Sequence, residues 1–291
     1  NPRTKQDEDV TRSQVAIFGS WRENIYLDPV YVAQLEQIKD KNKRKAWLAG
    51  DWNIVAGGAI DDLWDETIHI IPRFKVPKNW KVDRALDWGS STPFSVGWFA
   101  ESNGEEVEAL NGTKLWFPRG TIIQIAEFYG AEGGIGSNKG LRMSAANLGR
   151  KVLEYEAKML ENGWISKQPI AGPADNQIDN NIDEGEETIK VKMEEVGCYW
   201  KRSNKNKGSR ENGLQLLRDR LEASVNREGM GFYITDNCKV TKALLPTLPR
   251  DSDNPDDIDT EAEDHIWDMI RFRLLAGTRT LADEVDFEMA S

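Results

Sequence analysis

Three aspartates have the positions expected of a site for phosphate chemistry. Asp87 lies near the end of an apolar, strand-like segment, Asp175 ends a second such segment, and Asp268 lies in an amphipathic segment near the C-terminus. Buried carboxylates are unfavourable unless they are paired or bound to a metal, and hard oxygen ligands suit Mg²⁺ or Mn²⁺. Two such ions about 3.5–4 Å apart activate a water and stabilise a phosphate during hydrolysis. If the three side chains converge, they predict a two-metal site; in the alternative, Asp87 only caps the loop that follows it.

The segment that holds Asp268 also carries His265, one of two histidines in the chain. At 100° per residue one face of this segment is acidic and the opposite face is apolar. The acidic face consists of Glu261, Asp264, His265 and Asp268, and the apolar face of Ile266, Trp267, Ile270 and Leu274. His265 would be a supplementary metal ligand or a general acid or base. A hydrogen bond to a carboxylate or backbone group is an equal alternative, and an ordinary solvated acidic face is another.

A basic loop would supply contacts to nucleic-acid phosphates. Between residues 201 and 210 it holds five cations and no acid: Lys201, Arg202, Lys205, Lys207 and Arg210. This patterning contrasts with a net charge of −11, although a solvated turn is the alternative. The chain as a whole is therefore not expected to attract nucleic acid without a local basic groove.

Composition excludes several classes of function. The chain has 291 residues, 39% of them hydrophobic and 30% charged, as in soluble globular proteins. No apolar run approaches the length that spans a bilayer, and the N-terminus has no signal-peptide pattern. The two cysteines, Cys198 and Cys238, have no metal-ligand spacing, which argues against a zinc site and favours a reducing compartment. No Gly-rich loop followed by Lys-Ser/Thr is present, so no ATPase activity is expected.

Hydrophobic periodicity predicts the elements that would position these residues. A first strand is expected at 82–88, with Val82, Leu86 and Trp88 on one face and Asp83, Ala85 and Asp87 on the other. Three antiparallel strands are expected after it, at 95–101, 114–117 and 121–129. A long helix at 145–162, capped by Ser144, follows a glycine-rich surface loop at 130–142. Strands at 168–175 and 198–201 and an edge strand at 231–234 then alternate with helices at 186–196, 210–224, 239–245 and 261–276. Hairpins and alternation together predict an α/β fold with a mixed sheet covered by helices.

The domain boundaries follow from the same pattern. Residues 1–65 are interpreted as a helical linker or arm from the end of another domain, with a strand at 15–18 and helices at 30–40 and 43–49. Residues 66–280 would form the catalytic domain, and residues 281–291 a C-terminal tail. The first residues lack an initiator Met and suggest a cut within a larger protein.

Several short motifs, taken in order, resemble the C-terminal nuclease domain of the large terminase subunit of tailed bacteriophages, with its preceding linker. The resemblance covers nearly the whole chain. It rests on Ala85-Leu86-Asp87-Trp88-Gly89, Gly172-Pro173-Ala174-Asp175, Gly208-Ser209-Arg210, and Asp264-His265-Ile266-Trp267-Asp268-Met269-Ile270-Arg271-Phe272. Upstream, Tyr26-Leu27-Asp28-Pro29 and Trp47-Leu48-Ala49-Gly50-Asp51-Trp52 are similar to the stretch that joins the two domains in these proteins.

The resemblance implies an RNase H-like fold and a metal-dependent endonuclease that cuts concatemeric viral double-stranded DNA during genome packaging. Asp87, Asp175 and Asp268 would be its catalytic metal ligands, with His265 as an auxiliary and Mg²⁺ or Mn²⁺, as two ions, as the cofactor. The implied partners are double-stranded DNA and, in a full-length protein, an ATPase domain, a small terminase subunit and a portal, in the host cell cytoplasm and without a membrane. One departure is the acidic stretch at 251–264, which would repel DNA and is expected to be disordered or to point away.

Two alternatives remain from the sequence. An RNase H-like recombinase or resolvase would share the carboxylates and would cut branched DNA or transfer strands. A non-catalytic part of a packaging motor would instead use its acidic faces to dock on a partner protein.

Overall fold

A central strand, β2 (Lys81–Asp87), is buried on both faces and organises the sheet. The computed structural model describes residues 58–180 and 187–277. Val82 and Leu86 point to one face of the strand and Ala85 to the other, as the alternation of side chains in a strand requires. Asp83 and Asp87 share the face of Ala85, where they meet the C-terminal helix. The predicted alternation along this strand is confirmed.

The main sheet has seven strands in the order β1-β9-β6-β3-β2-β7-β8. Its centre is antiparallel: β3 pairs with β2 on one side and with β6 on the other. The flanks are parallel, since β9 runs parallel to β6 and β1, while β7 runs parallel to β2 and β8. The bounds are β1 (Ile70–Ile71), β3 (Ser95–Glu101), β6 (Ile122–Tyr129), β7 (Pro173–Ala174), β8 (Lys201–Arg202) and β9 (Phe232–Thr235). The predicted mixed sheet is therefore confirmed.

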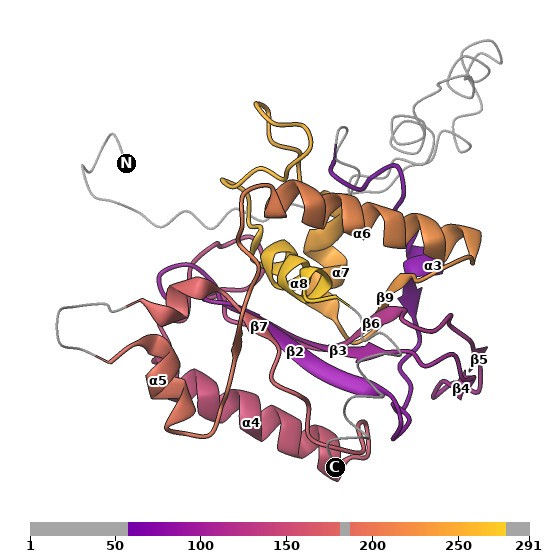
Figure 1. Ribbon diagram of the computed structural model, residues 1–291, viewed down its shortest axis with the longest axis horizontal. Helices are drawn as coiled ribbons and strands as arrows, with labels where there is room; N and C mark the ends of the chain where they lie inside the picture. The colour runs from indigo at the N-terminus through magenta and orange to yellow at the C-terminus, as the bar shows by residue number, and fades with distance from the viewer. Residues whose placement is uncertain (1–57, 181–186, 278–291) are drawn as a thin grey trace, which may run out of the picture. The chain divides into compact units, whose positions relative to one another are not determined.

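Helices cover both faces of this sheet (Figure 1). One face carries α4 (Ala145–Glu161) and α5 (Ile189–Glu194), whose apolar side chains join those of Val82 and Leu86 in one core cluster. The other face carries α6 (Ser209–Asn226), α7 (Lys239–Leu244) and α8 (His265–Leu275), which pack around Ala85 in a second cluster. Short elements complete the fold: α3 (Glu66–His69), η2 (Asn176–Asp179) and η3 (Leu245–Thr247).

Two ion pairs set the position of α8 along β2. Arg273 lies 2.5 Å from Asp83, and His265 lies 3.0 Å from Asp87, so the helix runs antiparallel to the strand. Eight helical residues span about 12 Å and four strand residues about 13 Å, so the two spacings match. The helix approaches the sheet closely because β3 has Gly97 beneath it, where an added Cβ atom would collide with the sulfur of Met269.

Some predicted elements are wrong in place or length. The segment at 114–117 is not a strand of the main sheet, because β5 (Lys114–Leu115) pairs with β4 (Val107–Glu108) in a separate two-stranded sheet. The strand at 231–234 is not an edge, because β9 lies between β1 and β6.

The remaining differences concern the ends of elements. The strand at 168–175 shortens to Pro173–Ala174, since two prolines in it cannot donate to a ladder. The strand predicted at 198–201 is observed as the shorter β8, at Lys201–Arg202. The helix predicted at 186–196 is observed as α5, which Thr188 caps at its N-terminus. The helix predicted from 261 begins at His265, because Asp259 accepts a bond from the backbone N–H of Glu261 and holds a turn there.

The described residues belong to a compact unit that extends from Val55 to Ser291. Ala59 and Ile60, which precede the predicted domain boundary, are buried in the cluster around α6 and α8. The predicted strand at 15–18, the helices at 30–40 and 43–49, and the tail at 281–291 lie outside the described residues. Within the described part of the chain, no helix has the length and apolar character to cross a membrane.

Candidate functional site

Asp87 and His265 form the centre of a cluster at the carboxyl end of β2. Asp87 is 4% exposed, and its Oδ2 lies 3.0 Å from Nδ1 of His265. The other ring nitrogen, Nε2, lies 3.2 Å from Oδ1 of Asn138 in the glycine-rich loop. Two oxygens therefore face the two nitrogens, an arrangement that orients the imidazole between the sheet and that loop.

Asp175 reaches the same region from the end of β7, next to β2. It is 3% exposed, and its Oδ1 accepts a hydrogen bond from the backbone N–H of Gln177, which caps η2. The same oxygen lies 2.6 Å from Nζ of Lys205. Parallel pairing of β7 with β2 brings Asp175 and Asp87 to one edge of the sheet, as expected for the carboxyl ends of parallel strands.

Asp268 lies on the first turn of α8, close to the N-terminal residue of the helix. Its Oδ1 lies 3.1 Å from Arg210 of α6 and 3.0 Å from Arg271. Arg210 also contacts Asp257 at 2.8 Å and Asp264 at 3.2 Å. One guanidinium therefore gathers three carboxylates beside the cluster.

The charges in the cluster act on one another. Burial raises the pKa of Asp87 to about 7, the hydrogen bond from His265 opposes this rise, and the charges of Asp268 and Asp175 add to it. Burial and the charge of Asp268 likewise raise the pKa of Asp264 to about 6, against the pull of Arg210. Burial disfavours the charged form of His265, but the bond to Asp87 and the surrounding acids outweigh it and raise the pKa of His265. The cluster thus carries more negative charge than its own cations offset.

The donor set fits a hard divalent cation in type and charge. Asp87, Asp175 and Asp268 offer oxygens, and His265 offers a nitrogen, next to one another at one edge of the sheet. As placed, however, no group of three or more His, Cys, Asp or Glu side chains in residues 58–180 and 187–277 is spaced to hold a metal ion. Asp175 and Asp268 are paired instead with cations of the chain, and Asp87 with His265. A bound metal would therefore have to replace Lys205 and turn aside the arginines.

The basic loop divides into two sets of side chains. Lys205 forms an ion pair with Asp175, and Arg210 forms one with Asp268. Arg202 instead pairs with Asp179 at 3.0 Å, outside the cluster. The side chains of Lys201 and Lys207 are exposed. The structure therefore brings only two of the five predicted phosphate contacts to the carboxylate cluster.

The acidic stretch at 251–264 is neither disordered nor turned away, which corrects the expectation. Asp257 and Asp264 are 8% and 9% exposed and contact Arg210 at the cluster. Sequence spacing cannot show this, because Arg210 lies 47 residues before Asp257. The acid of this stretch therefore neutralises a basic side chain inside the protein, and does not simply repel a ligand.

Sequence reasoning also missed the contribution of the glycine-rich loop. Glu263 accepts hydrogen bonds from the hydroxyl of Tyr129 and from the backbone N–H of Gly136, both at 2.8 Å. With Asn138 on His265, these contacts hold the loop against the start of α8. The only sequence feature that could indicate this contact is the acidic Glu263, two residues before His265, and the sequence does not identify the partners of its carboxylate.

Comparisons with known proteins show similarity at the level of structure. No family profile matches the sequence, and no curated protein is significantly similar to it. The nuclease domain of the P22 large terminase matches with a TM-score of 0.52 and 15% identity, over 78% of this chain and 97% of that domain. The large terminase of a thermophilic bacteriophage matches with a TM-score of 0.50 and 15% identity, over 87% of this chain. The match covers 53% of that terminase, so this chain spans about half its length.

These likenesses establish the fold. The mixed seven-stranded sheet flanked by helices is the RNase H-like fold of terminase nuclease domains. A weaker match, with a TM-score of 0.45 and 8% identity, is to the large terminase nuclease of the thermophilic phage G20c with bound cobalt. That similarity is too low to transfer the metal to this chain.

Proposed function

We propose that this chain is a metal-dependent endonuclease that cuts double-stranded DNA during viral genome packaging. The observation that carries the proposal is that Asp87 and Asp175 end neighbouring parallel strands, while His265, three residues before Asp268 on the docked helix, contacts Asp87. The fold shared with terminase nuclease domains supports it. The finer biology, with concatemeric DNA as substrate and an ATPase domain, small terminase subunit and portal as partners, rests on that fold and on the motifs.

The three carboxylates would hold Mg²⁺ or Mn²⁺, as two ions, with His265 beside Asp87 as an auxiliary. When bound, such ions activate a water and stabilise the charge on a phosphate under attack. The chain's own residues have two further tasks. His265, fixed between Asp87 and Asn138, holds a proton at Nδ1 or Nε2 next to the reacting phosphate. Lys205, once a metal on Asp175 had displaced its ammonium group, would donate to an oxygen of the phosphodiester beside the cluster.

The test is cutting of supercoiled plasmid by the purified chain in Mg²⁺, in Mn²⁺ and in chelator. Wild type should cut only with metal, and Asp87→Asn should abolish cutting while its far-UV spectrum and unfolding midpoint stay native. Asp179→Asn is the matched control, because this carboxylate lies four residues from Asp175 but pairs with Lys190 and Arg202. Cutting by Asp87→Asn at the wild-type rate would contradict the proposal, and so would a wild-type chain inactive with every metal. Products confined to branched DNA would favour a resolvase.

A further inference from the structure

The glycine-rich loop at 130–142 is attached to the segment that follows Asp87. The backbone N–H of Gly140 donates a hydrogen bond to the carbonyl of Ser91 at 2.8 Å. The two segments pack so closely that a Cβ atom at Gly140 would lie 2.2 Å from the carbonyl oxygen of Ser90. The loop therefore has a fixed position relative to the end of β2 that carries Asp87.

The same loop is attached to the start of α8. The backbone N–H of Gly136 donates to the carboxylate of Glu263 at 2.8 Å, two residues before His265. Asn138, two residues further along the loop, has a left-handed backbone with a φ of +46°, which asparagine tolerates better than most residues do. Its Oδ1 lies 3.2 Å from Nε2 of His265. The loop thus holds one amide oxygen opposite the outer nitrogen of the imidazole.

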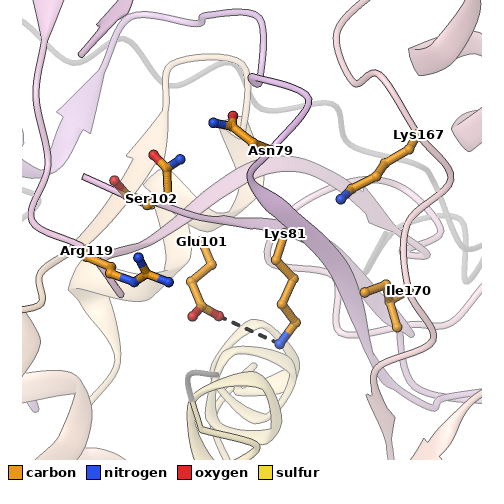
Figure 2. A pocket seen from close by; sticks show the side chains of 8 residues that line it. Asn79, Lys81, Glu101, Ser102, Arg119, Lys167 and Ile170 are labelled. Carbon is orange, nitrogen blue, oxygen red and sulfur yellow. Dashed lines mark ion pairs between the residues drawn. The ribbon is translucent and has the colours of Figure 1, made fainter. Parts of the chain in front are cut away.

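The other end of α8 is anchored independently of this loop. Arg273 contacts Asp83 at 2.5 Å and Glu101 at 3.1 Å. Figure 2 shows Lys81, at the start of β2, directed toward the carboxylate of Glu101, which it contacts at 3.7 Å. These ion pairs hold the helix, and with it the backbone of His265, on the sheet. What remains to be determined at His265 is the orientation of its ring.

The two atoms that face the imidazole determine this orientation. An amide oxygen only accepts hydrogen bonds, so the contact with Oδ1 of Asn138 requires a hydrogen on Nε2 of His265. Nδ1 then faces Oδ2 of Asp87 at 3.0 Å. A ring flipped about its Cβ–Cγ bond would place carbon atoms opposite both oxygens and would lose both hydrogen bonds. Nδ1 is therefore the nitrogen presented to the carboxylate cluster, and Nε2 is bonded to the loop.

We propose that Asn138 is the positioning residue of His265, and that it holds Nε2–H at the loop so that Nδ1 alone serves the carboxylate cluster. The inference rests on the proposed nuclease function, because it states which atom of His265 acts there. Histidines that bind metals generally donate their second ring N–H to a fixed acceptor, which sets the tautomer and the ring plane. Either role considered for His265, metal ligand or proton carrier, would then be performed at Nδ1.

The first arm of the test follows the imidazole by NMR, in chelator and without DNA. The chain has two histidines, so labelling of histidine with ¹⁵N gives two ring systems. Both Nε2–H groups should be protected from exchange in wild type, since His69 donates from Nε2 to the buried carbonyl of Leu221. Asn138→Gly should speed the exchange of the His265 proton by about three- to tenfold, the equivalent of one hydrogen bond, and leave that of His69 unchanged. Glycine is used because it adopts a positive φ without strain.

Two further variants separate the side chain of Asn138 from the loop itself. Asn138→Asp keeps an acceptor of the same length on a residue that tolerates the same backbone, so the His265 proton should stay protected. Ser137→Gly is the matched control, since it adds a glycine one residue earlier and should leave that proton protected. The amide of Gly136 should stay protected in all three variants, because its bond to Glu263 is kept. Exchange of the His265 proton at the wild-type rate in Asn138→Gly would overturn the proposal, as would equal acceleration in Ser137→Gly.

The second arm measures the initial rate of plasmid cutting in Mn²⁺ as a double-variant cycle. Asn138→Gly should lower the rate by about tenfold in the wild-type chain. In a chain that already carries His265→Ala it should have little further effect, because the acceptor then has no ring to hold. Equal losses in both chains would overturn the proposal, since Asn138 would then act independently of His265. A wild-type chain that does not cut would contradict the nuclease proposal, and the exchange measurement would still decide whether Asn138 positions His265.

Discussion

Replacement of Arg273 by methionine tests how α8 is held on the sheet. Arg273 is buried, and its guanidinium contacts Asp83 at 2.5 Å and Glu101 at 3.1 Å. Methionine keeps the apolar stem but removes the buried guanidinium from both carboxylates, and the Lys81 that also contacts them is 22% exposed. Removal of one partner from a buried ion pair lowers stability by about 3–5 kcal/mol. For a domain of this size that loss corresponds to a fall in Tm of about 6–20 °C.

The assay is urea and thermal unfolding of wild type and Arg273→Met at one pH and salt concentration. Lys114→Met is the control, because it breaks an exposed pair with Glu106 and should leave the midpoint unchanged. Adding Asp83→Asn and Glu101→Gln to Arg273→Met should restore part of the loss, since the unpaired charges are then removed. A loss below about 1 kcal/mol for Arg273→Met would refute the reasoning that these buried pairs fix α8 on β2.

Three further predictions follow from individual contacts. Gly97→Ala should lower the free energy of unfolding by about 1–3 kcal/mol, because the added Cβ would collide with the sulfur of buried Met269. In a chain that already carries Met269→Ala, the cost of Gly97→Ala should be smaller. Additive losses in unfolding experiments would show that the two residues do not touch. Burial lowers the pKa of His69, against the effect of its hydrogen bonds to Leu221 and Asp65, so the unfolded chain binds the proton at a higher pH than the folded chain does. As the pH falls below 6.5, the free energy of unfolding of wild type should therefore fall by up to about 1.4 kcal/mol per pH unit relative to His69→Gln. Parallel pH profiles of the two proteins would exclude this. Lys205→Met should lower the thermal unfolding midpoint in chelator and enlarge the rise of that midpoint on adding Mg²⁺. The reason is that the metal then no longer competes with an ammonium group 2.6 Å from Asp175. An equal or smaller rise than in wild type would show that Lys205 does not occupy the place of the metal.

The sequence predicts the centre of the fold well because local patterns determine it. The alternation in 82–88 correctly places Val82 and Leu86 on one face of β2 and Asp83 and Asp87 on the other. Ser144 caps α4 as expected, with its hydroxyl accepting from the N–H of Asn147. These features depend on residues close together in the chain.

The errors arise where a partner distant in sequence decides the outcome. The sequence of 231–234 looks like an edge strand, yet β1, far earlier in the chain, covers its free side. The acidic stretch at 251–264 is expected to be disordered or to point away because its charge would repel DNA, yet Arg210, 47 residues before Asp257, holds Asp257 and Asp264 at the cluster. Residue types therefore indicate where charge gathers, but not which charges neutralise one another.

The central claim is that Asp87, Asp175 and Asp268 form one cation-dependent hydrolytic centre. The measurement that tests it most directly is the initial rate of supercoiled plasmid cutting in Mn²⁺ by wild type and by the three single Asp→Asn variants, with Asp179→Asn alongside. The account predicts that each of the three variants loses cutting while Asp179→Asn retains it. Cutting at the wild-type rate by any one of the three folded variants would remove that residue from the centre and contradict the account.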